Sequence, residues 1–308
     1  MRTYHYANAA GLSAIAFASY FDVYSHRHIF IGTDPWWNPA HLILYAGFAV
    51  IVYGVARGRP RGAVGRLSIA GVAVVLAAAA FNEVWHRVLL FGNPLPEPFP
   101  VEPPHALLAL GFIFLGLAAL LHPLREGSVV SDVPGRVAAA FVGGSLWLIV
   151  GGSALYVAGA YPSTAAYLFA VGAASFSASL FLVYPTALAR RPGYSTLSYM
   201  WFLLVYFVFF VSPVGGLPYG LGLVLLVDLA TARGKVAGFK SRYLVLPLVA
   251  AFYGLVYYPI LPTQLTLAFN AGLVASSAGV AVEFFVERIF LRSQKGGKAS
   301  VSFQPGPE

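Results

Sequence analysis

The sequence contains no cysteine and few charged residues. Among 308 residues, Lys and Arg number 19 and Asp and Glu number 11, so only 10% of the chain is charged, while 59% is hydrophobic. A soluble domain carries about 25% charged residues. These charges are too few to cover a water-exposed surface, which excludes an ordinary soluble domain and predicts an integral membrane protein. The lack of cysteine excludes disulfides, iron–sulfur clusters and thiolate metal sites, so His, Asp, Glu and backbone oxygen remain as strong ligands.

Apolar runs long enough to cross a bilayer, about 20 residues each, recur along the whole chain. Ten windows qualify: residues 8–26, 39–56, 67–87, 104–122, 137–160, 164–189, 197–212, 217–232, 243–261 and 264–291. The fold class is therefore expected to be all-α, a polytopic integral membrane protein with about ten transmembrane helices.

Positive charge is distributed unevenly over the predicted loops. With the N-terminus in the cytoplasm, 17 of the 19 Lys and Arg residues lie on the cytoplasmic side, and only Arg27 and Arg87 lie outside. By the positive-inside rule, this predicts a multi-pass protein of the cell membrane with both termini in the cytoplasm. The net charge of +8 is explained by this topology, and no nucleic-acid partner is expected.

Histidine is confined to the first part of the chain, and no histidine follows residue 122. Five of the seven histidines lie in or directly beside two predicted loops on the outer face, between helices 1 and 2 and between helices 3 and 4. The seven are His5, His26, His28, His41, His86, His105 and His122. The chain is therefore expected to comprise a four-helix metal-site region (1–125), a six-helix membrane scaffold (126–296) and a disordered cytoplasmic tail (297–308).

The two histidine loops repeat one another. In both, the order is Phe, a polar residue, His-Arg, Gly, Pro, His, Gly-Phe, which begins at Phe21 in the first copy and at Phe81 in the second. This order predicts a duplicated helical hairpin. Each hairpin brings one histidine from a helix end and one from the next helix start, where Pro39 and Pro103 are suited to the first turn.

Acidic or amide side chains lie one helical turn from the first histidine of each hairpin. Asp22 precedes His26 by four residues, and Asn82 and Glu83 precede His86 by four and three. Residues at these spacings share a helix face. Asp22 and Glu83 lie within predicted spans, where ionisable groups are costly and commonly functional.

Packing of the two hairpins is expected to bring four imidazoles and several carboxylates to one level near the outer interface. The candidate metal ligands are Asp22, His26, His41, Glu83, His86 and His105. A Glu-x-x-His spacing occurs at Glu83/His86 and again at Glu102/His105, as it does in carboxylate di-iron sites. For any one of these residues alone a structural interfacial role is favoured, whereas the whole set favours a bound metal. No catalytic residue is assigned.

The segment from Asp22 to Phe48, with Asp22-x-x-x-His26 and Pro39-Ala-His41, resembles the metal-binding segment of the C subunit of copper-dependent particulate methane and ammonia monooxygenases. The resemblance covers about 27 of 308 residues. It implies that Asp22, His26 and His41 bind copper, with Asp34 and Pro39 in supporting positions, and that His86, His105 and Glu83 form a second site or complete the first.

The resemblance implies a copper-binding subunit of an oxygenase-like or redox assembly, with its site on the extracytoplasmic side and other membrane subunits as partners. Its enzyme class would be a copper-dependent monooxygenase-like enzyme or a respiratory-complex subunit. Ligand type also permits iron or zinc. Two other functions stay open: an electron-transfer subunit that holds haem b through the same histidines, and a non-enzymatic metal carrier or assembly subunit.

Overall fold

The structure is a computed structural model, and it describes residues 2–29, 37–85, 88, 102–126, 133–152, 154, 164–183, 193–209, 224–229, 232, 270–275, 277–279 and 281–282. These residues are almost entirely helical and include no strand, which confirms the all-α class. The principal elements are α1 (Arg2–His28), α2 (Pro39–Gly58), α3 (Gly62–Val84), α4 (Pro103–Glu126), α5 (Val133–Trp147), η2 (Leu148–Gly152), α7 (Thr164–Ser177), η3 (Ala178–Val183) and α9 (Tyr194–Phe209).

Four of the described helical segments are long and apolar enough to cross a membrane. They are Pro39–Gly58, Gly62–Val84, Pro103–His122 and Val133–Gly152. These segments support the predicted membrane protein and coincide with predicted spans two to five. The predicted spans from residue 217 onward lie mostly outside the described residues, as does the tail from residue 297, so the count of ten and the orientation stay predictions.

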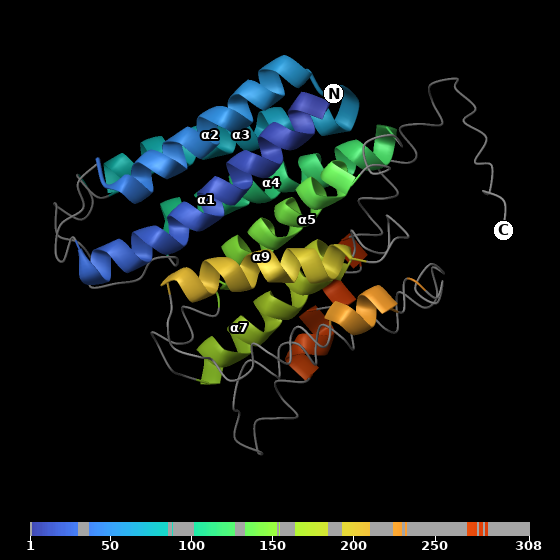
Figure 1. The fold of residues 1–308 in the computed structure, drawn as a ribbon. Coiled ribbons are helices and arrows are strands. Elements are labelled where there is room, and N and C mark those ends of the chain that lie inside the picture. Colours follow the sequence, from blue (N-terminus) through green and yellow to red (C-terminus); the bar gives the residue numbers. More distant parts are fainter. Residues whose placement is uncertain are drawn as a thin grey trace.

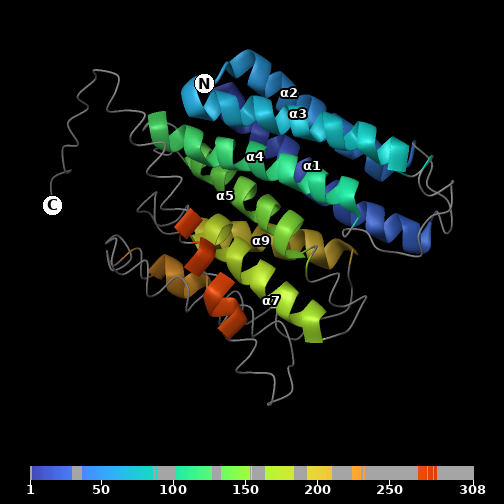
Figure 2. The same ribbon diagram turned by 180° about the vertical axis from the view of Figure 1, so that it is seen from behind.

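The first predicted span, α1, is not among those four apolar segments, unlike the three helices that follow it. In Figures 1 and 2, α1 and α4 lie between the pair α2 and α3 on one side and α5 on the other. The side chains of Leu12, Ile15 and Ala16 are fully buried. Since α1 contacts protein along much of its length, it needs fewer apolar side chains than a helix that faces lipid.

The outer helices show the opposite pattern. Only 22% of the α2 span is buried, against 67% of the span formed by α5 and η2. Large apolar side chains of α2 and α3 are exposed, among them Tyr53, Ile69 and Leu76. In a membrane protein such side chains face lipid, so α2 and α3 form the lipid-facing side of this region.

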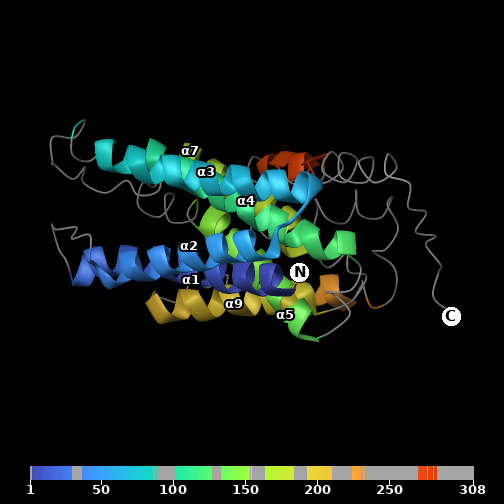
Figure 3. The same ribbon diagram turned by 90° about the horizontal axis from the view of Figure 1, so that it is seen from above.

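Two antiparallel hairpins, α1–α2 and α3–α4, make up the histidine-bearing region. The start of α1 meets the start of α3 and the end of α4: Tyr4 hydrogen-bonds through its hydroxyl to Ser68, 2.8 Å away, and its ring lies 4.7 Å from that of His122. The loop-bearing ends of both hairpins therefore lie together at the other end of the bundle, as Figure 3 shows from above.

Asp228, which is near a predicted cytoplasmic helix end, has a structural role. Its carboxylate accepts hydrogen bonds from the backbone N–H and the hydroxyl of Thr196, in the first turn of α9. A carboxylate at this place satisfies backbone donors that no helix carbonyl can reach.

Candidate metal centre

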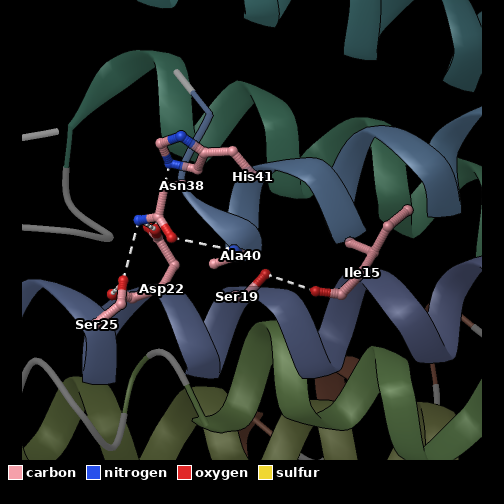
Figure 4. Close-up of polar contacts among 7 residues, drawn as sticks. All are labelled: Ile15, Ser19, Asp22, Ser25, Asn38, Ala40 and His41. Atoms are coloured by element: carbon pink, nitrogen blue, oxygen red, sulfur yellow. Dashed lines mark hydrogen bonds and ion pairs between the residues drawn. The ribbon is translucent and has the colours of Figure 1, made fainter. Parts of the chain in front are cut away.

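The first hairpin site begins with the cap of α2. Asn38 is the N-cap residue, and its Oδ1 accepts a hydrogen bond from the backbone N–H of Ala40 at 3.0 Å. Pro39 follows at the first helical position, where its missing N–H costs nothing. The Asn-Pro pair thus starts the helix abruptly and places His41 in its first turn, facing the end of α1 (Figure 4).

Asp22 and His41 meet across the hairpin. Asp22 Oδ1 lies 3.2 Å from His41 Nε2, and the two side chains are 14% and 19% exposed. The carboxylate therefore reaches the imidazole from a neighbouring helix in a largely buried setting, where an ion pair needs further hydrogen bonds to offset its desolvation.

Asn38 supplies one of those additional hydrogen bonds. Its Nδ2 donates to Asp22 Oδ1 at 3.2 Å and to Ser25 Oγ at 3.0 Å, and Ser25 Oγ donates to the backbone carbonyl of Asp22 at 2.9 Å. Figure 4 shows this arrangement, with Asn38 between the two helices. One amide thus caps α2 and holds the carboxylate that faces His41.

The predicted partner of this pair, His26, belongs to α1 one turn after Asp22. Its side chain lies outside the described part of the structure, so its role as a ligand stays a prediction. His28, which was not a predicted ligand, is exposed and its ring lies 4.5 Å from that of Tyr24.

The second hairpin brings together the second of the two Glu-x-x-His pairs in the sequence, Glu102 and His105. His105 Nδ1 lies 3.1 Å from Glu102 Oε2, with side-chain exposures of 19% and 6%. Glu83, the predicted carboxylate of this hairpin, is exposed on α3. His86 lies outside the described residues. The buried carboxylate next to His105 is therefore Glu102, just before α4.

The described side chains hold two acid–imidazole pairs at the same end of the bundle. Within the described ranges, no three or more His, Asp and Glu side chains form a group that could hold a metal ion. The pairs Asp22–His41 and Glu102–His105 are therefore separate in the described part of the chain, and whether His26 or His86 joins either pair stays a prediction, because both side chains fall outside that part.

Sequence reasoning did not identify Asn38 or Ser25. The available signal was the Asn38-Pro39 dipeptide, because asparagine is a favoured N-cap and proline a favoured first helical residue. It marks the start of α2 but does not show that the same amide reaches back to α1.

No family model, curated protein or solved structure matches this chain. The chemistry of the site is therefore argued from its own geometry.

Proposed function

We propose that this protein is a metal-binding membrane subunit, with copper as its metal, of an oxygenase-like or redox assembly. Asp22, His26 and His41 are the proposed ligands of the first site, on the extracytoplasmic side of the cell membrane. The observation that carries the proposal is the buried approach of Asp22 Oδ1 to His41 Nε2, 3.2 Å apart, from two different helices.

The donor set fits a borderline transition metal. Carboxylate oxygen and imidazole nitrogen without sulfur suit Cu(II), Zn(II) and iron. The two atoms are of the donor types that such an ion takes, and their separation of 3.2 Å is short enough for both to contact one ion. Little rearrangement of the hairpin is therefore needed for both groups to face one ion.

The chain's own residues would prepare this site before a metal binds. Asn38 holds the Asp22 carboxylate through Nδ2 and fixes the first turn of α2 through Oδ1. Such supporting hydrogen bonds orient ligands and are worth about 10-fold to 100-fold in metal affinity at established sites. A bound copper ion would supply redox chemistry or Lewis acidity.

The test is metal binding by the full-length chain in detergent. Copper content after loading and dialysis is measured by plasma mass spectrometry, and the dissociation constant by competition with a chelator. We expect His41→Ala and Asp22→Asn each to weaken copper binding by at least about 10-fold. His28→Ala is the matched control, since it removes an exposed imidazole of α1 and should bind copper as the parent chain does.

Unchanged copper affinity in both His41→Ala and Asp22→Asn would overturn the proposal. An optical spectrum of the protein as purified separates the alternatives. A Soret band that is present in the parent protein and disappears in His41→Ala would show that the site holds haem b and not copper. The absence of a Soret band, together with stoichiometric copper, supports the proposal. Iron or zinc in place of copper would keep the site and change its chemistry.

A further inference from the structure

The two helices of each hairpin cross at positions that are equivalent in the sequence repeat. A Cβ atom on Gly11 would lie 2.5 Å from the carbonyl oxygen of Gly47, and one on Gly111 would lie 3.2 Å from that of Gly71. Gly71 follows Gly11 by 60 residues, and Gly111 follows Gly47 by 64. The helices of each hairpin therefore cross at equivalent glycines.

The side chains at the crossings also correspond. Gly11 faces Ile51, and Gly71 faces Leu115, which is 64 residues further on. Because both sides of each crossing obey the same two offsets, 60 for the first helix and 64 for the second, the register can be carried to the loop-bearing end. It pairs Asp22 with Asn82, as the sequence repeat also does.

The register reveals an exchange of acid and amide. On the first helix, Asp22 is replaced by Asn82. On the second, Asn38 is replaced by Glu102, while the histidine is kept as His41 and His105. Each hairpin thus has one carboxylate, one amide and one imidazole at three equivalent positions, but the carboxylate has moved from the end of the first helix to the start of the second.

The contact between carboxylate and imidazole changes with the position of the carboxylate. His41 meets its carboxylate across the hairpin, at 3.2 Å, whereas His105 meets Glu102, three residues before it, at 3.1 Å. The 6% exposure of Glu102 matters because a buried carboxylate requires a polar partner. The extra methylene of Glu relative to Asp provides reach from this position.

The donor and acceptor roles at two further equivalent positions are also reversed between the hairpins. In the first hairpin, Asn38 donates to Ser25 Oγ. The residue equivalent to Ser25 is Trp85, whose Nε1 is only a donor, and the residue equivalent to Asn38 is now an acceptor. Trp85 Nε1 and Asn82 Oδ1 are buried, with no hydrogen-bond partner within the described ranges.

We propose that Glu102 is the carboxylate of the metal site in the second hairpin, with the role that Asp22 has as a ligand in the first, and that Glu83 does not have this role. The inference rests on the proposed metal-binding function. It implies that carboxylate charge is needed once per hairpin, at either of the two exchangeable positions, to orient the imidazole and to balance the charge of the cation.

Exchange variants of the full-length chain in detergent test this inference with Cu(II) as the probe. Asp22→Asn should weaken copper binding at the first hairpin by about 10-fold to 100-fold. The double variant Asp22→Asn/Asn38→Glu places the carboxylate, with the same side-chain length, where the second hairpin has it, and should recover affinity to within about threefold. A merely structural role for Asp22 predicts no recovery of copper affinity.

The second hairpin provides the reciprocal test. Glu102→Gln should weaken copper binding or lower its stoichiometry, Glu83→Gln should have the smaller effect, and Glu102→Gln/Asn82→Asp should restore binding. Thermal unfolding without metal shows whether each variant folds. If Glu102→Gln does not fold, the comparison of Asp22→Asn with its double variant alone decides whether the carboxylate can be exchanged between the two positions.

The outcomes separate this inference from the function on which it rests. Copper affinity unchanged in both His41→Ala and Asp22→Asn removes the metal-binding function and the inference with it. If His41→Ala weakens binding but neither double variant recovers affinity, or if Glu83→Gln weakens binding more than Glu102→Gln, the function stands and the exchange of carboxylates is wrong.

Discussion

The two hairpins have the same crossing but support their histidines differently. In α1–α2 the carboxylate lies on one helix and the imidazole on the other, so their contact also joins the helices. In α3–α4 the carboxylate and the imidazole both lie at the start of α4. The glycine contacts are equivalent in the two hairpins, while the carboxylate that faces the imidazole comes from a different position in each.

The largest expected difference between the hairpins concerns their glycines. A Cβ on Gly11 would lie 2.5 Å from the backbone oxygen of Gly47, whereas a Cβ on Gly71 would lie 3.1 Å from the equivalent oxygen of Gly111 and has its closest contact, 2.7 Å, with the Leu115 side chain. A backbone clash cannot be relieved by a change of rotamer. Gly11→Ala should lower the free energy of unfolding by roughly 3 kcal/mol and Gly71→Ala by about 1 kcal/mol.

The measurement is detergent-induced unfolding followed by circular dichroism on both variants. Equal losses in the two variants, or a larger loss for Gly71→Ala, would show that the crossings do not differ as their contacts indicate.

The second prediction concerns Asn38, the residue that precedes Pro39 at the start of α2. Asn38→Ala removes the N-cap of α2 and both hydrogen bonds from Nδ2. Loss of a cap costs about 1 kcal/mol, and copper affinity should fall as well because Asp22 loses its support. Asn38→Asp restores the cap but not the donor, so it should recover stability more fully than copper binding. Parallel unfolding and copper titrations check this split, and equal recovery of both would contradict it.

The smallest effect is expected where the hairpins touch each other. Tyr4 of α1 and Ser68 of α3 share a hydrogen bond of 2.8 Å. Hydrogen bonds between membrane helices contribute about 0.6 kcal/mol on average, so Tyr4→Phe should lower stability by about that amount. Copper binding should not change, because the site lies at the other end of the bundle. A loss of copper affinity in Tyr4→Phe would show that the two ends are coupled. Tyr6→Phe is the matched control.

Much of the histidine-bearing region follows from local patterns. The apolar windows predict helices that coincide with α2, α3 and α4, and the repeated order of scarce residues predicts two similar hairpins. Asp22 and His41 were both predicted as ligands of one site, and they do lie together. These features are predictable because a bilayer-length apolar run and a helix face depend only on neighbours along the chain.

Other features depend on neighbours from elsewhere in the chain. Glu-x-x-His spacing occurs at both Glu83/His86 and Glu102/His105, and it does not show that the Glu83 side chain is exposed while Glu102 is buried against His105. Whether Glu83 and His86 bind a metal together stays a prediction, because His86 lies outside the described residues. Spacing along one helix identifies a shared face but not whether that face points inward.

Composition alone establishes that this chain belongs in a membrane, because 30 charged residues cannot cover the surface of a 308-residue soluble protein. The order of residues adds the two hairpins. The tertiary structure decided three further points: α1 is an interior helix, Asn38 links the cap of α2 to Asp22, and Glu102 is buried next to His105. Each of these depends on burial and on contacts between separate helices, which only helix packing specifies.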